Sequence, residues 1–242
     1  MDFTILDLLS SGMSLFIVIT GISLGIYTYK VYRKNQQSSY LLSSILFITL
    51  PLPYSVDIFY ILDDLFSLDL SHTTLGMISG WSVPILATTW IFITAILYKE
   101  KYPTQIKILT GVNVVLGLLF WYQLFVVTDF QLEPIPNSVL FSLIYGLIPT
   151  LIIAIYAIIA LSFIFPSYMY FSIKSTDPLF KIRSKLIAFG ALLFPIGGLF
   201  DAIVVDVSLF TNILIRIIIL SSLLCLYLGY NTPDRIRNKY ST

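Results

Sequence analysis

The sequence has very little of the chemistry that holds metals or crosslinks chains. It contains one cysteine, Cys225, and one histidine, His72. A single cysteine cannot form an internal disulfide, and one cysteine with one histidine does not supply the usual ligand set for zinc or iron. We therefore expect no disulfide framework, no metal site and no cofactor.

Charge is also scarce. Only 11% of the 242 residues are charged, whereas a soluble domain has about 25%. Hydrophobic residues make up 57% of the chain, and the mean hydropathy is +0.92. Such a chain cannot cover its apolar surface in water, so we predict an integral membrane protein. The formal net charge of +1 excludes a strongly basic nucleic-acid binder, and we expect no nucleic-acid partner.

Long apolar runs account for nearly the whole length. They lie at about 10–31, 40–62, 74–98, 106–128, 138–165, 185–206 and 209–230. Each run is long enough to cross a bilayer as a helix, and the runs do not alternate as barrel strands do. We predict an all-α integral membrane protein with a single seven-helix transmembrane domain over residues 1–230. Residues 231–242 form a short basic tail, which could lie on the membrane surface as a helix.

The charges between the runs sort by sign. Thirteen of the fourteen basic residues lie on one predicted side: Lys30, Arg33, Lys34, Lys99, Lys101, Lys107, Lys174, Lys181, Arg183, Lys185, Arg235, Arg237 and Lys239. The other side carries only acids: Asp2, Asp7, Asp63, Asp64, Asp69, Asp129, Glu133 and Asp206. Because basic loops stay inside, we predict an outside N-terminus, an inside C-terminus and a multi-pass protein of the cell membrane.

Three ionisable residues fall within the runs instead of at their ends. Asp57 lies in the second run, Asp201 in the sixth and Arg216 in the seventh. A charge at mid-span costs at least about 2.5 to 3.5 kcal/mol on insertion scales, so each needs a partner or water. Asp201 and Arg216 are symmetric about the turn between their helices, at a depth of roughly 11 Å. This symmetry predicts an ion pair, and Asp57, at roughly 8 Å, can join the same layer.

Other polar side chains are predicted at a similar depth in the outer half. They are Trp81, Gln123, Tyr145 and Asn212, which with the three charges form the candidate ligand-binding set. The sequence leaves two interpretations open: a buried ion pair that fixes helix register, or a site that contacts a ligand or takes up a proton. Arg216 suits a carboxylate or phosphate. An outer surface without basic residues repels anions, however, so a cationic or neutral ligand stays open.

Small residues and prolines occur inside several runs. The pairs Gly21/Gly25 and Gly76/Gly80 each lie on one helical face, and we favour packing inside the bundle over a dimer interface. Prolines are expected to kink their helices because they remove a backbone donor. Those inside runs are Pro51, Pro53, Pro84, Pro149 and Pro195.

Several membrane chemistries have no support in the sequence. No run has a lysine in its core, so a retinal Schiff base has no place to form. The segment Gly197-Gly198-Leu199-Phe200-Asp201 lacks the Gly-x-Gly-Asp order of intramembrane aspartyl proteases. There is also no GxGxxG, phosphate loop or HExxH motif. We do not expect an enzyme.

Two segments carry a resemblance to known proteins. They are Pro51-Leu52-Pro53 leading to Asp57, and Lys181-Ile182-Arg183-Ser184-Lys185 leading to Gly198 and Asp201. With seven runs and short loops, the chain resembles uncharacterised seven-helix membrane proteins of archaea. It is also similar to the seven-helix sensor regions that precede histidine-kinase domains. The resemblance implies sensing, with signalling through a separate partner because no effector domain follows Tyr230.

We therefore expect a receptor-like or sensory protein that recognises a small ligand, a lipid or a physical cue in its outer half. Besides membrane lipids, a cytoplasmic or membrane protein partner would dock on the basic inner residues Lys174, Lys181, Arg183 and Lys185. Two alternatives are a transporter or ion pathway, and a structural or assembly subunit of a membrane complex. The inner halves of the runs offer few ionisable groups, which counts against a transporter.

Overall fold

The computed structural model describes residues 5–98, 103–128, 130–134, 141–203 and 209–231. Within these residues, seven helical segments are long and apolar enough to cross a membrane. They are Leu8–Asn35, Ser38–Asp63, Thr73–Ile96, Pro103–Val127, Leu147–Lys174, Pro178–Asp201 and Phe210–Tyr230. The structure therefore confirms the predicted bundle of seven spans, and it supports a multi-pass membrane protein.

Prolines divide the second and third spans. The first span is the continuous helix α1 (Ile5–Asn35), but the second comprises α2 (Ser38–Thr49), the 3₁₀ turn η1 (Leu52–Tyr54) and α3 (Ser55–Phe66). The third span comprises α4 (His72–Gly80) and α5 (Val83–Ile96), with Pro84 in the first turn of α5. Pro51, Pro53 and Pro84 lack the backbone N–H that a continuous helix would use, and the helices break beside them.

The remaining spans include two π-helical turns. Helix α6 (Pro103–Tyr122) continues into η2 (Gln123–Val127). Helix α7 (Leu147–Ile159) continues through η3 (Ala160–Ile164) into α8 (Phe165–Lys174). Helix α9 (Pro178–Ile203) contains Pro195, and α10 (Leu209–Tyr230) completes the described spans.

A short antiparallel sheet interrupts the helical pattern. Strand β1 (Phe130–Pro134) pairs with β2 (Phe141–Tyr145), with Phe130 opposite Tyr145. The predicted helical run at 138–165 was wrong in its first part, because residues 141–145 pair as a strand and the helix begins at Leu147. Pro149 consequently lies in the first turn of α7, where the absent N–H has no helical partner to lose, and it does not kink the span.

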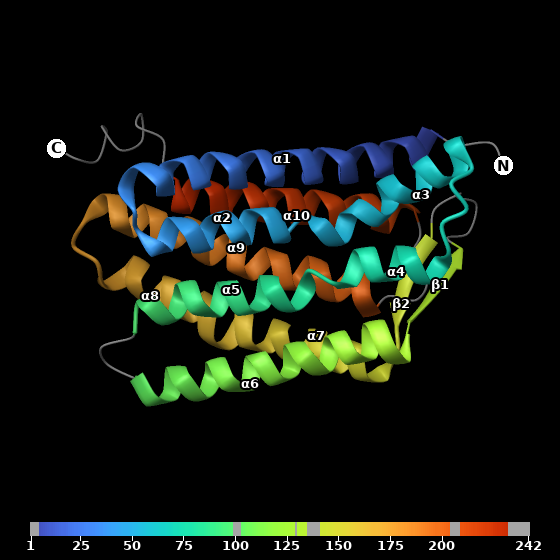
Figure 1. Cartoon of the computed structure of the whole chain (residues 1–242). Coiled ribbons are helices and arrows are strands. Elements are labelled where there is room, and N and C mark those ends of the chain that lie inside the picture. The colour runs from blue at the N-terminus through green and yellow to red at the C-terminus, as the bar shows by residue number, and fades with distance from the viewer. Residues whose placement is uncertain (1–4, 99–102, 129, 135–140, 204–208, 232–242) are drawn as a thin grey trace.

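The helices lie side by side along their length, and the hairpin of β1 and β2 lies at one end of the bundle (Figure 1). We call this end the hairpin end; α1 begins there and α3 ends there. We call the opposite end, where α1, α8 and α10 finish, the basic end. The described basic residues outside the span centres gather at it: Lys30, Arg33, Lys34, Lys107, Lys174, Lys181, Arg183 and Lys185. The structure thus reproduces the predicted separation of charge, whereas which end faces outside stays a prediction.

The glycine pairs pack inside the bundle. A Cβ on Gly21 would lie 2.5 Å from Pro51, and one on Gly25 would lie 2.5 Å from Ile48. A Cβ on Gly76 would overlap the ring of Phe130. These contacts bring α1 against α2 and α4 against the hairpin, as expected for small residues at helix interfaces.

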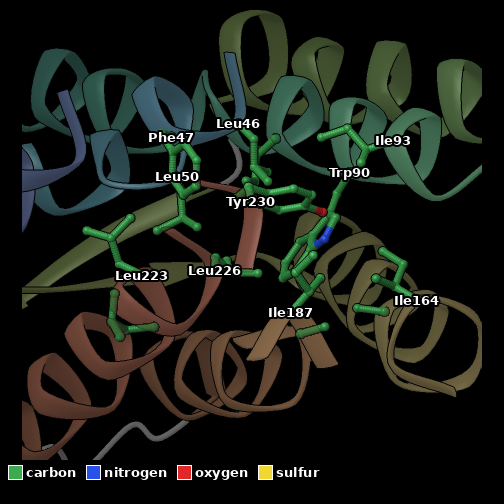
Figure 2. Close-up of a cluster of buried hydrophobic side chains, with 14 of the residues drawn as sticks. Leu46, Phe47, Leu50, Trp90, Ile93, Ile164, Ile187, Leu223, Leu226 and Tyr230 are labelled. Atoms are coloured by element: carbon green, nitrogen blue, oxygen red, sulfur yellow. The ribbon is translucent and has the colours of Figure 1, made fainter. Parts of the chain in front are cut away.

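The main hydrophobic core lies between α2, α5, α9 and α10. Figure 2 shows its residues, among them Leu46 and Phe47 of α2, Trp90 of α5, and Leu223 and Tyr230 of α10. Near it, the Nε and Nη2 of Arg183 donate to the carbonyls of Gly229 and Tyr230, at 3.0 and 2.9 Å. Arg183 therefore caps the last turn of α10 from the first turns of α9. The predicted tail helix over 232–242 lies outside the described residues.

Candidate functional site

Local structure places the three membrane charges on three helices. Asp57 occupies the first turn of α3, just after the proline break, where the positive end of the helix dipole favours an acid. Asp201 lies near the end of α9, and Arg216 lies in the first half of α10. We call Asp57, Asp201 and Arg216 the charged triad.

Arg216 joins both carboxylates. Its Nη2 donates to Oδ2 of Asp57 over 3.0 Å. Its Nη1 lies 3.2 and 3.3 Å from Oδ1 and Oδ2 of Asp201. The predicted pairing of Asp201 with Arg216 and the predicted participation of Asp57 are therefore both present in the structure.

Two further side chains complete the surroundings of the triad. Ser14 of α1 donates its hydroxyl to Oδ2 of Asp57 over 2.6 Å. The ring of Tyr54 lies beneath the guanidinium of Arg216, whose Cζ is 4.6 Å from the ring centroid. The arginine is thus held by charge on its edge and by an aromatic ring on its face.

The triad is unevenly buried and unevenly charged. The side chains of Arg216 and Asp57 are each 5% exposed, whereas that of Asp201 is 34% exposed. Two carboxyl groups share the single guanidinium of Arg216. Within the described residues the buried Nε of Arg216 has no hydrogen-bond partner. The triad is consequently closed at Asp57 and open at Asp201.

Asn212 lies beside the triad rather than in it. Its Oδ1 accepts a hydrogen bond from Ser10 of α1 over 3.3 Å, one helical turn from the Ser14 contact. Both contacts tie α1 to the layer of polar groups at the hairpin end. Asn212 therefore has a structural partner on α1, and its place in a ligand site stays a prediction.

Tyr145 is also near the triad. It is the last residue of β2, and its hydroxyl lies against Gly80 of α4. Burial and the nearby carboxylate of Asp201 raise the pKa of the Tyr145 phenol, whereas a hydrogen bond with Ser79 lowers it. The phenol therefore stays neutral and is a hydrogen-bonding group beside Asp201.

Trp81 and Gln123 have other surroundings. The Trp81 carbonyl accepts a hydrogen bond from the indole of Trp121 over 2.8 Å, and the Trp81 side chain is 39% exposed. Gln123 is buried at the start of η2. Among the contacts of the described residues, none joins Trp81 or Gln123 to the charged triad. Their place in a ligand site stays a prediction.

Sequence reasoning missed Ser10, Ser14 and Tyr54. Ser10 and Ser14 are one helical turn apart in an apolar helix, a spacing that puts both hydroxyls on one face. That spacing was a usable signal. Tyr54 gave none, because only the 3₁₀ turn after the prolines aims its ring at Arg216.

At the basic end, the four predicted partner-binding residues differ in exposure. Lys174, Lys181 and Lys185 are exposed. Arg183 is half-buried, and its guanidinium is engaged by the α10 carbonyls. The three lysines are thus the members of this set that a partner could reach.

The described residues contain no group of three or more His, Cys, Asp or Glu side chains placed to hold a metal ion. Comparisons with known protein families, with curated proteins and with solved structures found no match. The geometry of the charged triad is therefore the main indication of function.

Proposed function

We propose that this chain is a receptor-like or sensory protein of the cell membrane whose charged triad contacts the ligand or cue. The observation that carries the proposal is the uneven burial of the triad. Arg216 and Asp57 are buried, but a third of the Asp201 side chain is accessible. Asp201 is the group that an incoming molecule can reach.

The charge balance favours a cationic group over an anion. Both terminal nitrogens of Arg216 already donate to carboxylates, so the forked contact that would hold a phosphate or carboxylate is occupied. The second carboxyl group, that of Asp201, lies on the accessible side. A cation at Asp201 would compete with Arg216 and weaken the link between α9 and α10.

The orientation in the membrane belongs to the same proposal. By the positive-inside bias, the basic end faces the cytoplasm and the hairpin end faces out. A separate protein partner would then meet the exposed Lys174, Lys181 and Lys185, while Arg183 holds α10 in place. Signalling through such a partner belongs to the same proposal.

The proposal can be tested with two small probes of opposite charge. The protein in lipid nanodiscs is mixed with ethylamine hydrochloride or sodium propionate at equal ionic strength, and its unfolding temperature is measured. We expect ethylamine, and not propionate, to shift the unfolding temperature of the wild type. Asp201→Asn should remove the shift because it removes the accessible carboxylate.

Asp69→Asn is the matched control. Asp69 is exposed at the hairpin end, and its φ of 54° is a conformation that asparagine also adopts. This variant should keep the ethylamine shift. An equal response in Asp201→Asn would show that the triad is not the contact point and would favour the structural-subunit alternative.

A further inference from the structure

A cavity of about 90 Å³ lies between α5, α7 with η3, and α9, apart from the charged triad. Its accessible wall is entirely apolar. The residues that shape it include Leu86, Trp90, Ile153, Ala160, Pro195 and Gly198. Trp90 and Phe194 form one side as an edge-to-face pair, with ring centroids 5.8 Å apart.

Small residues on facing helices create the space. Ala157 and Ala160 line it from the fifth span, and Gly198 lines it from α9. A Cβ built on Gly198 would meet no atom within 4 Å. A side chain at Gly198 would therefore fit without a clash. At Gly197, one residue earlier, a Cβ would lie 2.7 Å from Ile219.

The cavity lies at a depth where a hydrocarbon chain is the expected occupant. Trp90 and Ile153 lie well inside their spans, roughly 9 Å from the ends of α5 and α7 at 1.5 Å per residue. A bound water needs two to four polar partners, whereas the accessible surface of this wall is apolar and the polar atoms of its residues Trp90 and Tyr156 are buried. Ile153 and Leu199 are only half-buried, so the cavity reaches the bundle surface that faces lipid.

We propose that this cavity binds the end of an unbranched alkyl chain that enters sideways from the bilayer. For comparison, an apolar cavity that binds benzene measures about 150 Å³. This cavity, at about 90 Å³, is smaller and suits the narrow end of an alkyl chain. The chain can come from a bilayer lipid or from a free alkyl compound dissolved in the membrane.

Photocrosslinking tests the site directly. The protein is placed in nanodiscs of phosphatidylcholine that carries a diazirine near the methyl end of one acyl chain. After illumination, labelled residues are identified by mass spectrometry. We expect labelling at the wall residues Tyr156, Ala157, Ala160, Phe194, Pro195 and Gly198, in addition to the lipid-facing residues Leu151, Ile155 and Ile158.

Filling the cavity should remove that labelling. Gly198→Leu places a side chain in the open space, and labelling of the cavity wall should fall several-fold. Gly111→Leu is the matched control, because a Cβ on Gly111 of α6 also meets nothing within 4 Å but does not line the cavity. Ala157→Leu fills the cavity from the opposite wall if Gly198→Leu does not fold.

A second arm separates the two sources of the chain. A fatty alcohol that carries the same diazirine is added to nanodiscs of ordinary phosphatidylcholine. Wall labelling by the lipid probe identifies a bilayer acyl chain, and wall labelling by the alcohol alone identifies a free alkyl compound; either supports the site. Labelling confined to the lipid-facing residues in the folded wild type, or unchanged in folded Gly198→Leu, would overturn it.

Discussion

At the scale of single residues, Arg216 has the most partners to lose. It contacts Asp57, Asp201 and the ring of Tyr54, and it is 4% exposed. A buried charge that loses its partner costs far more than the pair gains when it forms. The partners of Arg216 should therefore differ in importance according to how well water can replace them.

Asp57→Asn should destabilise the protein more than Asp201→Asn. Asp57 is buried. Its neutralisation removes a charged partner of Arg216 at a place that water does not reach, and it should lower the free energy of unfolding by about 3 kcal/mol. Asp201 is partly exposed, and Arg216 keeps Asp57 as a second partner, so neutralisation of Asp201 should cost less than about 1 kcal/mol. Reversible unfolding in mixed micelles measures both, and equal losses would contradict the closed-and-open description of the triad.

Arg216→Gln should be the most damaging change at the triad. It leaves Asp57 buried without its cation, at a cost of about 3 to 5 kcal/mol. The double variant Arg216→Gln/Asp57→Asn removes both charges of the buried pair. Its loss of stability should be clearly smaller than the sum of the two single losses, as a double-mutant cycle would record. Simple additivity would mean that the two side chains do not interact.

At the scale of elements, apolar run length predicted the spans but not their internal breaks. The fifth run is apolar from 138 onward, and nothing in its composition separates a strand at 141–145 from a helix. Short apolar runs are ambiguous in this way until a pairing partner is known. The partner here is β1, which the sequence did not reveal.

The helix pair α9 and α10 depends on close backbone approach. Ser222 donates its hydroxyl to the carbonyl of Gly190 over 2.9 Å, and a Cβ on Gly190 would lie 2.5 Å from Leu226. Gly190→Ala should destabilise the protein because α10 must move away. Gly111→Ala should instead stabilise it by up to about 1 kcal/mol, because alanine favours helix and no atom is nearby. Thermal unfolding of the two variants should therefore shift in opposite directions, and a shared sign would count against this close packing.

At the scale of the whole molecule, the sequence predicted the number of spans, the gathering of basic residues at one end and the meeting of the three membrane charges. Depth arithmetic was sufficient for the triad because antiparallel helices joined by a short turn place equally distant residues at one level. Depth says nothing about rotation, however. Trp81 has the predicted height, yet its side chain is half-exposed and in contact with none of the triad.

Orientation in the membrane can be measured with single cysteines. After Cys225→Ser removes the one native thiol, Asp69→Cys marks the hairpin end and Lys181→Cys marks the basic end, both at exposed positions. A membrane-impermeant maleimide should label Asp69→Cys in intact cells and Lys181→Cys only after the cells are opened, because basic segments stay inside. The reverse pattern would invert the proposed placement of the ligand site.

The hydrogen bonds from Arg183 to the last carbonyls of α10 restrict how α9 and α10 can move relative to one another. Arg183 and Asp201 lie on the same helix, eighteen positions apart, and each holds α10, at Gly229 and Tyr230 in one case and at Arg216 in the other. Because these two contacts lie near opposite ends of the helix pair, α9 and α10 cannot slide along one another. While both contacts hold, α9 and α10 are linked over roughly 27 Å. Loss of the Asp201 contact alone frees the hairpin end of α10 from α9, while Arg183 and the Ser222 hydrogen bond still join the two helices.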